Sequence, residues 1–115
     1  SDLTDSRIRN YKRMQKRRVV FKLGVVYETP LMQLKEVPKI IEKAVKLSEN
    51  TVFDRAHFFS YGDFSLIFEV VYYVSSGDYN KYMDIQQNIN FIIKEKFEKM
   101  NINFAFPTQT LYLNK

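Results

Sequence analysis

Residues 64–75 carry the most regular strand pattern of the sequence and read Phe64-Ser65-Leu66-Ile67-Phe68-Glu69-Val70-Val71-Tyr72-Tyr73-Val74-Ser75. Successive side chains of a β-strand point to opposite faces. One face therefore carries only large apolar side chains, and the other carries Ser65, Ile67, Glu69, Val71 and Tyr73. The run predicts a strand that is buried on one face and partly covered on the other.

The segment before this strand predicts a hairpin. Residues 51–60 also have the composition of a strand, and the short link Tyr61-Gly62-Asp63 separates the two runs. A short link that contains glycine favours an antiparallel hairpin.

The preceding 30 residues predict a strand and a helix. Residues 18–27 alternate, with Val19, Phe21, Leu23, Val25 and Tyr27 on one face. Thr29-Pro30 is typical of a helix start, with a capping residue followed by proline at the first helical position. The helix should end at residues 48–50. Pro38 lies inside it, so we expect a kink there, or a short turn before a helix that restarts near Val37.

The C-terminal part predicts a second helix and a fourth strand. Asp78 is a plausible N-cap for a helix over residues 79–100, and an apolar stripe follows at helical spacing: Tyr82, Ile85, Ile89, Ile93, Phe97 and Met100. Residues 101–106 form a short strand pattern that Pro107 interrupts. Residues 108–113 then resume an extended pattern.

The order β-α-β-β-α-β predicts an α+β fold, a ferredoxin-like sandwich with an antiparallel sheet, two helices on one face and an extra C-terminal strand. We divide the chain into a linker or remnant of an upstream domain (1–17), the ferredoxin-like domain (18–106) and a C-terminal strand (107–115). The open sheet face should carry apolar side chains, and such a face favours a partner: Val20, Val26, Ile67, Val71 and Tyr73.

Composition excludes several kinds of chemistry. The chain has 115 residues, enough for one domain, and it has no cysteine and a single histidine, His57. Disulfides, thiolate catalysis and multi-histidine zinc sites are therefore excluded. The net charge is +5, and much of it comes from a basic run at residues 7–18. The chain begins with Ser1, so we expect it to be a piece of a longer protein.

Five segments together resemble the C-terminal region of the small-conductance mechanosensitive channel (MscS) family. They lie at residues 17–30 (RRVVFKLGVVYETP), 53–58 (FDRAHF), 63–74 (DFSLIFEVVYYV), 78–87 (DYNKYMDIQQ) and 104–110 (FAFPTQT). They cover nearly the whole chain in the expected order. The set is closest to the many-membered branch of channel homologues.

The resemblance implies an assembly module without enzymatic activity or cofactors. It implies transmembrane helices and an Sm-like β domain upstream, of which residues 8–14 would be the last piece. Seven identical copies would surround a vestibule on the cytoplasmic side of the bacterial inner membrane, with side portals for solutes. Tension in the bilayer would open the pore and release ions and osmolytes during hypoosmotic shock.

The C-terminal tail agrees with this picture. Pro107 should end sheet pairing, yet strand-like residues follow it. A lone extended tail leaves its amides unpaired, and a closed barrel built from several copies would pair them. We therefore hypothesise that Thr108–Leu113 is a barrel strand, and we expect the following residues to serve assembly: Phe106, Pro107, Thr108, Gln109, Thr110, Leu111 and Tyr112.

Other functions are weaker readings of the same residues. The basic run could bind nucleic acid or anionic lipid, but a solvated linker or an edge packed on the missing upstream domain explains it better. Residues 61–66 lack the basic residue and the aromatic that an RNA-recognition module needs. Asp54 and His57 could suggest acid–base catalysis, but Asp54, Arg55 and His57 fit local ion pairs or a subunit boundary better. Tyr72, Tyr73, Tyr79 and Tyr82 suit either the core or a subunit interface.

One alternative of a different class remains, a stand-alone ferredoxin-like regulatory domain that binds a small ligand and dimerises through its sheet. The channel reading expects self-association, membrane attachment through upstream segments, and neither nucleic acid nor a small-molecule substrate. It also expects no catalytic, cofactor or metal residues. Gly24 we assign to a bulge or to close packing.

Overall fold

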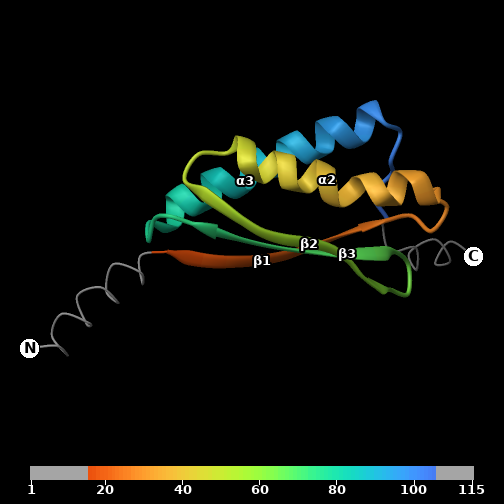
Figure 1. The fold of residues 1–115 in the computed structure, drawn as a ribbon, viewed down its shortest axis with the longest axis horizontal. Coiled ribbons are helices and arrows are strands. Elements are labelled where there is room, and N and C mark those ends of the chain that lie inside the picture. The colour runs from red at the N-terminus through yellow and green to blue at the C-terminus, as the bar shows by residue number, and fades with distance from the viewer. Residues whose placement is uncertain (1–15, 106–115) are drawn as a thin grey trace, which may run out of the picture.

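The computed structural model describes residues 16–105. Their elements are strand β1 (Arg17–Val25), helix α2 (Leu31–Leu47), strand β2 (Thr51–Tyr61), strand β3 (Leu66–Val74) and helix α3 (Tyr79–Lys99). The strands form one antiparallel sheet in the order β1-β3-β2. Both helices lie on the same face of this sheet (Figure 1). The domain is a small α+β sandwich of two layers.

Strand β3 is the centre of the fold, as its sequence predicts. Its helix-facing side chains are all buried: Leu66, Phe68, Val70, Tyr72 and Val74. The apolar stripe of α3 packs on them through Ile85, Ile89, Ile93 and Phe97, and α2 contributes Val37, Ile40, Ile41, Ala44 and Val45. This continuous core is what holds the two helices on one face.

The open face of the sheet is less exposed than the sequence predicts. Val71, at its centre, is 0% exposed although no helix covers this face. Ile67 and Tyr73 are half-buried, and Val20 is 44% exposed. β3 is the middle strand, so side chains from both neighbouring strands cover it. The sheet therefore hides most of this apolar surface without a partner.

Helix α2 differs from expectation at both prolines. Its N-cap is Pro30 and makes no side-chain capping bond, while the hydroxyl of Thr29 donates to the carbonyl of Val26 (2.7 Å). The predicted threonine cap is therefore wrong. The helix also runs through Pro38 as one element from Leu31 to Leu47, so the predicted restart near Val37 is wrong. Burial of Val37, Ile40 and Ile41 on the sheet offsets the hydrogen bond that Pro38 cannot donate.

Helix α3 follows the prediction closely. The carboxylate of Asp78 accepts a hydrogen bond from the backbone N–H of Asn80 (3.1 Å), which caps the first turn. Lys96 and Lys99 lie in the last turn, where positive charge interacts favourably with the helix dipole. The helix ends at Met100, and Asn101 adopts a φ of 59°.

A fourth strand is predicted over residues 101–106. The described part of this range, residues 101–105, forms a single β-bridge. Phe104 lies opposite Val25, and two backbone hydrogen bonds flank the pair, Val26 N–H to Asn103 O (3.1 Å) and Ala105 N–H to Gly24 O (3.0 Å). The described sheet therefore has three strands. The predicted ferredoxin-like order has a fourth strand at the position where this bridge lies.

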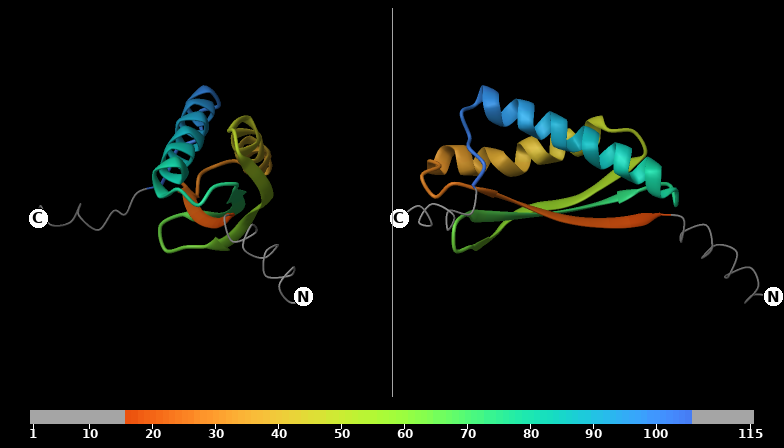
Figure 2. Two further views of the ribbon diagram at one scale, coloured as in Figure 1. Left: turned by 90° about the vertical axis from the view of Figure 1, so that its left-hand side faces the viewer. Right: turned by 180° about the vertical axis from the view of Figure 1, so that it is seen from behind.

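The two ends of the sheet are distinct. Arg17, Thr51 and Val74 lie at one end, which we call the near end, and Val25, Tyr61 and Leu66 lie at the other, the far end. The described chain begins at the near end. It finishes at Ala105 beside Gly24, close to the far end. Figure 2 shows the same arrangement from behind, with the start of β1 and residue 105 toward opposite ends of the domain.

Candidate assembly surfaces

The outer edge of β1 is an open strand edge. The carbonyl of Gly24 and the N–H of Val26 point away from the sheet, toward residues 103–105. Backbone groups of alternate residues in a strand point to the same side, so Arg18, Val20 and Lys22 direct their N–H and C=O groups to this edge. Among residues 16–105 the only partner on it is the bridge at Val25. Such an edge can pair with an added strand.

A groove runs along this edge, between β1 and α3. Its volume is about 530 Å³. We call it the β1 groove. Its lining is mostly apolar, with lysines and amides at the rim: Phe21, Lys22, Leu23, Tyr82, Gln86, Asn90, Phe91, Ile93, Lys94 and Phe104.

The wall of the β1 groove is fixed by contacts with the core. Phe104 stacks on Phe97 with ring centroids 4.8 Å apart. The buried hydroxyl of Tyr72 donates to Gln86 Oε1 (2.7 Å), and Gln86 Nε2 donates to Asn90 Oδ1 (2.9 Å). Burial raises the pKa of Tyr72 well above its ordinary value, so its hydroxyl remains a donor. The polar helix face predicted around Gln86 is thus part of the packing.

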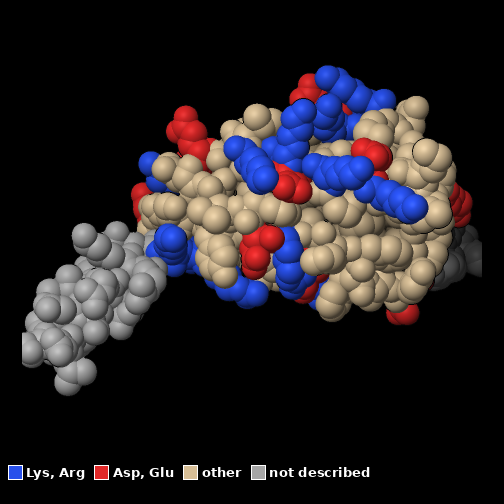
Figure 3. All heavy atoms as spheres, in the orientation of Figure 1, with Lys and Arg blue, Asp and Glu red and all other residues tan. Residues whose placement is uncertain are grey.

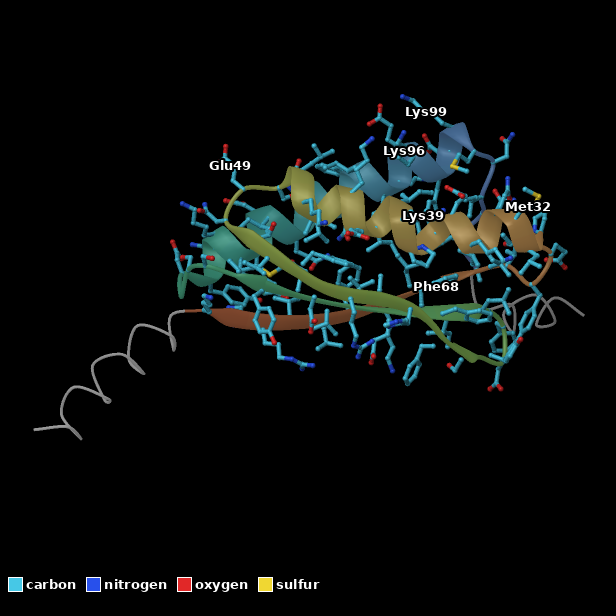
Figure 4. All side chains as sticks on the ribbon, viewed as in Figure 1. Met32, Lys39, Glu49, Phe68, Lys96 and Lys99 are labelled. Carbon is cyan, nitrogen blue, oxygen red and sulfur yellow. The ribbon has the colours of Figure 1, made fainter. Side chains whose placement is uncertain are left out.

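The far end of the domain carries a second apolar surface. Its exposed side chains come from the β1–α2 loop, the first turn of α2 and the β2–β3 hairpin, and we call them the hairpin patch: Tyr27, Leu31, Met32, Tyr61 and Phe64. The hydroxyl of Tyr27 donates to the carbonyl of Gly62, which joins the loop to the hairpin. Met32 is 80% and Tyr61 76% exposed. Figure 4 shows Met32 at this end, where α2 begins.

Four tyrosines are expected either in the core or at a subunit interface. Two of them, Tyr79 and Tyr82, contact Arg17 at the near end. The guanidinium of Arg17 lies 5.1 Å from the ring centre of Tyr82 and 5.6 Å from that of Tyr79, within cation–π range. Tyr72 is a core residue and Tyr73 is half-buried on the open face. Tyr79 is exposed beside residue 17.

A polar row crosses the open face of the sheet. Arg55 donates to Glu69 Oε1 (2.5 Å), and Lys22 and His57 are the register partners of Glu69 on the two sides. The hydrogen bond from Arg55 lowers the pKa of Glu69 below its ordinary value. The Lys22 ammonium lies 4.7 Å from the ring centre of Phe59. This geometry agrees with the expectation that Arg55 forms a local ion pair.

Much of the remaining charge lies on the helices. Lys and Arg side chains gather along the helical layer in Figure 3, and most of its acidic side chains pair with a lysine one turn away, as in Lys46–Glu42 (2.7 Å) and Lys94–Glu98 (3.1 Å). Within residues 16–105, no three His, Asp or Glu side chains gather as metal ligands. No helix of this range is both long and apolar enough to cross a bilayer.

Gly24 is packed closely against Ser65. Close packing is one of the two explanations expected for this glycine from the sequence. A Cβ atom built there would lie 2.7 Å from Ser65 Oγ and 2.8 Å from Ser65 Cβ. Strand β1 has an unbroken register with β3. Close packing therefore explains this glycine, and a bulge does not.

The residues predicted for assembly lie outside the described range: Phe106, Pro107, Thr108, Gln109, Thr110, Leu111 and Tyr112. Sequence reasoning missed the hairpin patch and the role of Phe91 in the β1 groove. A signal for the patch was present, because residues 26–34 and 58–65 contain only two charged side chains, Glu28 and Asp63. Phe91 lies off the apolar stripe of α3, which is a signal that this helix has a second apolar contact.

The chain matches one protein family and is similar to several known proteins of that family. Residues 19–104 match the family described as "Mechanosensitive ion channel MscS, C-terminal". The chain is 40% identical, over its whole length, to the small-conductance mechanosensitive channel MscMJ of Methanocaldococcus jannaschii. It is 38% identical, again over its whole length, to the large-conductance mechanosensitive channel MscMJLR of that organism.

A third relative is an uncharacterized MscS family protein of Aquifex aeolicus, 37% identical over 99% of the chain. The chain covers 33%, 33% and 32% of the lengths of these three relatives, in the order given. It thus spans about a third of each curated relative that it matches.

Proposed function

Because the chain belongs to the MscS mechanosensitive channel family, and is a channel domain rather than an enzyme, we propose that it is the vestibule domain of a mechanosensitive channel. In this role it assembles identical subunits and filters solutes. It also contributes to gating when ions and osmolytes leave the cell on hypoosmotic shock. The family match over residues 19–104, which covers both helices and all of the described sheet except the first two residues of β1, carries the proposal.

The direction of the chain through the domain supports this role. The described chain begins at the near end and its last residue, Ala105, lies toward the far end. Residues 1–17, the proposed linker or remnant of an upstream Sm-like β domain, would thus join one end of the domain, and residues 107–115 would continue from the other. A domain placed between a pore and a basal assembly needs this arrangement.

The register of the last bridge supports a tail that leaves the sheet. Ala105 is hydrogen-bonded to Gly24, so the same register would place residue 107 opposite Lys22. That position must donate an N–H to the Lys22 carbonyl, and Pro107 has none. We propose that residues 103–106 supply the fourth strand of a ferredoxin-like sheet. Residues 108–113 then pair with the same segment of neighbouring copies in a barrel.

We propose seven copies around a vestibule on the cytoplasmic side of the bacterial inner membrane, with portals between subunits. One relative is named a small-conductance channel and is 40% identical to the chain. Another is named a large-conductance channel and is 38% identical. Similarity therefore supports the kind of protein and leaves its conductance open. The β1 groove is where the alternative, a ligand-binding regulatory domain, would hold its ligand.

Patch-clamp recording tests this function. The complete natural polypeptide that contains the chain would be expressed in cells without other mechanosensitive channels and recorded under increasing suction. The proposal predicts pressure-activated currents and improved survival of hypoosmotic shock. Leu47→Ala, an exposed change away from both apolar surfaces, is the matched control and should leave both unchanged. Normal membrane expression without any pressure-activated current would contradict the proposal.

A further inference from the structure

The two apolar surfaces of this domain are built from different elements. The β1 groove is built on β1 and α3, and β1 is one edge strand. The hairpin patch is built on the β2–β3 hairpin and the start of α2, which packs beside β2, the other edge strand. Figure 2 shows α3 and α2 side by side over the sheet. We propose that the hairpin patch of one copy seats in the β1 groove of the next copy.

The composition of the hairpin patch favours a protein partner. The cores of protein interfaces are enriched in aromatic residues and methionine and depleted of lysine and glutamate. The patch consists of two tyrosines, a phenylalanine, a leucine and a methionine, and residues 26–34 and 58–65 contain no lysine or arginine. Each side chain is at least 45% exposed. Large apolar side chains that are exposed at one end of a domain are typical of an interaction site.

The β1 groove has the complementary features. Its floor is apolar, from Phe21, Leu23 and Ile93, and Phe91 stands 63% exposed on its wall. Lys22 and Lys94 line it, and the segments that carry the hairpin patch contain the acids Glu28 and Asp63, with Lys35 one helical turn from Leu31 and Met32. Seating one surface on the other therefore brings opposite charges together around an apolar centre. Charge complementarity of this kind fixes the orientation of an interface.

If identical subunits form a ring, the surface that fills the β1 groove belongs to a second copy of the same chain. A closed ring of more than two identical subunits uses a heterologous interface, in which two different surfaces of each subunit meet. The β1 groove and the hairpin patch are two different apolar surfaces and can form such a pair. The last described residue is Ala105, and its neighbour Phe104 lines the groove. If the tails of several copies meet, as proposed above, the far ends of those copies lie close together. The inference thus rests on the proposed homo-oligomer and names its contact.

Disulfide trapping tests this contact, since the chain contains no cysteine of its own. Tyr61→Cys marks the patch and Phe91→Cys marks the groove; both positions are exposed, so stability should change by no more than about 0.5 kcal/mol. The variants would be made in the complete natural polypeptide, with any cysteines outside the chain replaced by serine, and oxidised in membranes. The double variant should form a ladder of covalent multimers, and neither single variant should form dimers.

The control pair is Leu47→Cys with Phe91→Cys, because Leu47 is exposed to a similar degree (62%) but lies at the C-terminal end of α2, away from the patch. It should form no ladder. Dimers of Tyr61→Cys alone would mean that two patches meet face to face, and would overturn the proposal. So would a cross-link within one copy between Phe91→Cys and Tyr112→Cys, which would assign the groove to the chain's own tail.

The mass of the uncrosslinked protein separates two kinds of failure. An oligomeric mass without any ladder in the double variant would reject this contact and leave the proposed channel intact. A monomeric mass would reject the proposed function together with the contact. A ladder in the double variant alone, with an oligomeric mass, is the outcome that the inference predicts.

Discussion

The backbone N–H of Ala105 donates to the carbonyl oxygen of Gly24 over 3.0 Å, and this bond joins the end of the described chain to the open edge of β1. Gly24 is also the residue whose missing Cβ makes room for Ser65 at the hairpin. The last described residue, Ala105, is therefore connected through Gly24 to the packing of the far end. Changes at this point should affect both stability and assembly.

Gly24→Ala should destabilise the domain by about 1–3 kcal/mol, because the new methyl group would overlap Ser65 and force a shift of the hairpin. Ser65→Gly removes both overlapping atoms. A double-mutant cycle measured by urea denaturation should therefore give a favourable coupling of about 1 kcal/mol or more. Additive effects of the two changes would show that the overlap with Ser65 is not the cause.

Phe104→Ala should release the bridge at Val25. The ring stacks on the fully buried Phe97 and is half-buried, so its removal should cost about 1–3 kcal/mol, less than the 3–5 kcal/mol typical of a fully buried phenylalanine. Hydrogen exchange should accelerate at the amides of Val26 and Ala105 and remain slow at the centre of β3. Phe91→Ala, in the same groove but exposed, is the control and should change stability by less than about 0.5 kcal/mol. Unchanged exchange at both amides in Phe104→Ala would refute this role.

The sequence predicted the central strand, the hairpin and the capped second helix, because each has a local signal. Alternation over residues 64–75, the glycine at position 62 and Asp78 ahead of the helix all act within a few residues. The core faces of β3 and α3 followed from periodicity alone. The family resemblance rested on these same segments, and the family match confirms it.

Features set by contacts distant in sequence were not predictable. The predicted helix cap at Thr29 is absent because the hydroxyl of Thr29 donates to the carbonyl of Val26 instead. Pro38 did not divide α2 because burial of that helix on the sheet outweighs one missing hydrogen bond. Register shifts after Phe53 and Phe58 interrupt the alternation of β2. The β1 groove is invisible in the sequence because it forms between residues about 70 positions apart.

Pro38→Ala should stabilise the domain. The substitution allows an N–H at position 38 to donate to the carbonyl of Leu34, and alanine is about 3 kcal/mol more favourable than proline inside a helix. Loss of the half-buried ring contacts will reduce this gain, so we expect about 1–2 kcal/mol in urea denaturation. Lys39→Ala, an exposed neighbour, is the control. A destabilised Pro38→Ala would indicate that the proline ring is a packing element.

The ion pair of Arg55 with Glu69 should make stability depend on pH. The folded-state pKa of Glu69 is below its ordinary value of 4.5, so its contribution is fully present above that value. The contribution is lost as pH falls through the lowered pKa. The stability difference between wild type and Glu69→Gln should therefore be constant from pH 7 to pH 5 and shrink below pH 4.5.

Glu42→Gln is the matched control for this prediction, because Glu42 pairs with Lys46 on the exposed face of α2. An exposed pair contributes about 0–1 kcal/mol, so its removal should leave the pH profile almost parallel to that of the wild type. A Glu69→Gln difference that stays constant down to pH 3 would contradict the assigned ion pair.

The mass of the complete natural polypeptide, measured by native mass spectrometry from membranes with and without residues 107–115, tests the central claim most directly. If the chain assembles identical subunits beneath a pore, the intact protein should be a ring of several copies, seven by family resemblance. Deletion of the tail should shift the population toward smaller species. A monomer in both cases, from protein that is folded and inserted in the membrane, would contradict this account.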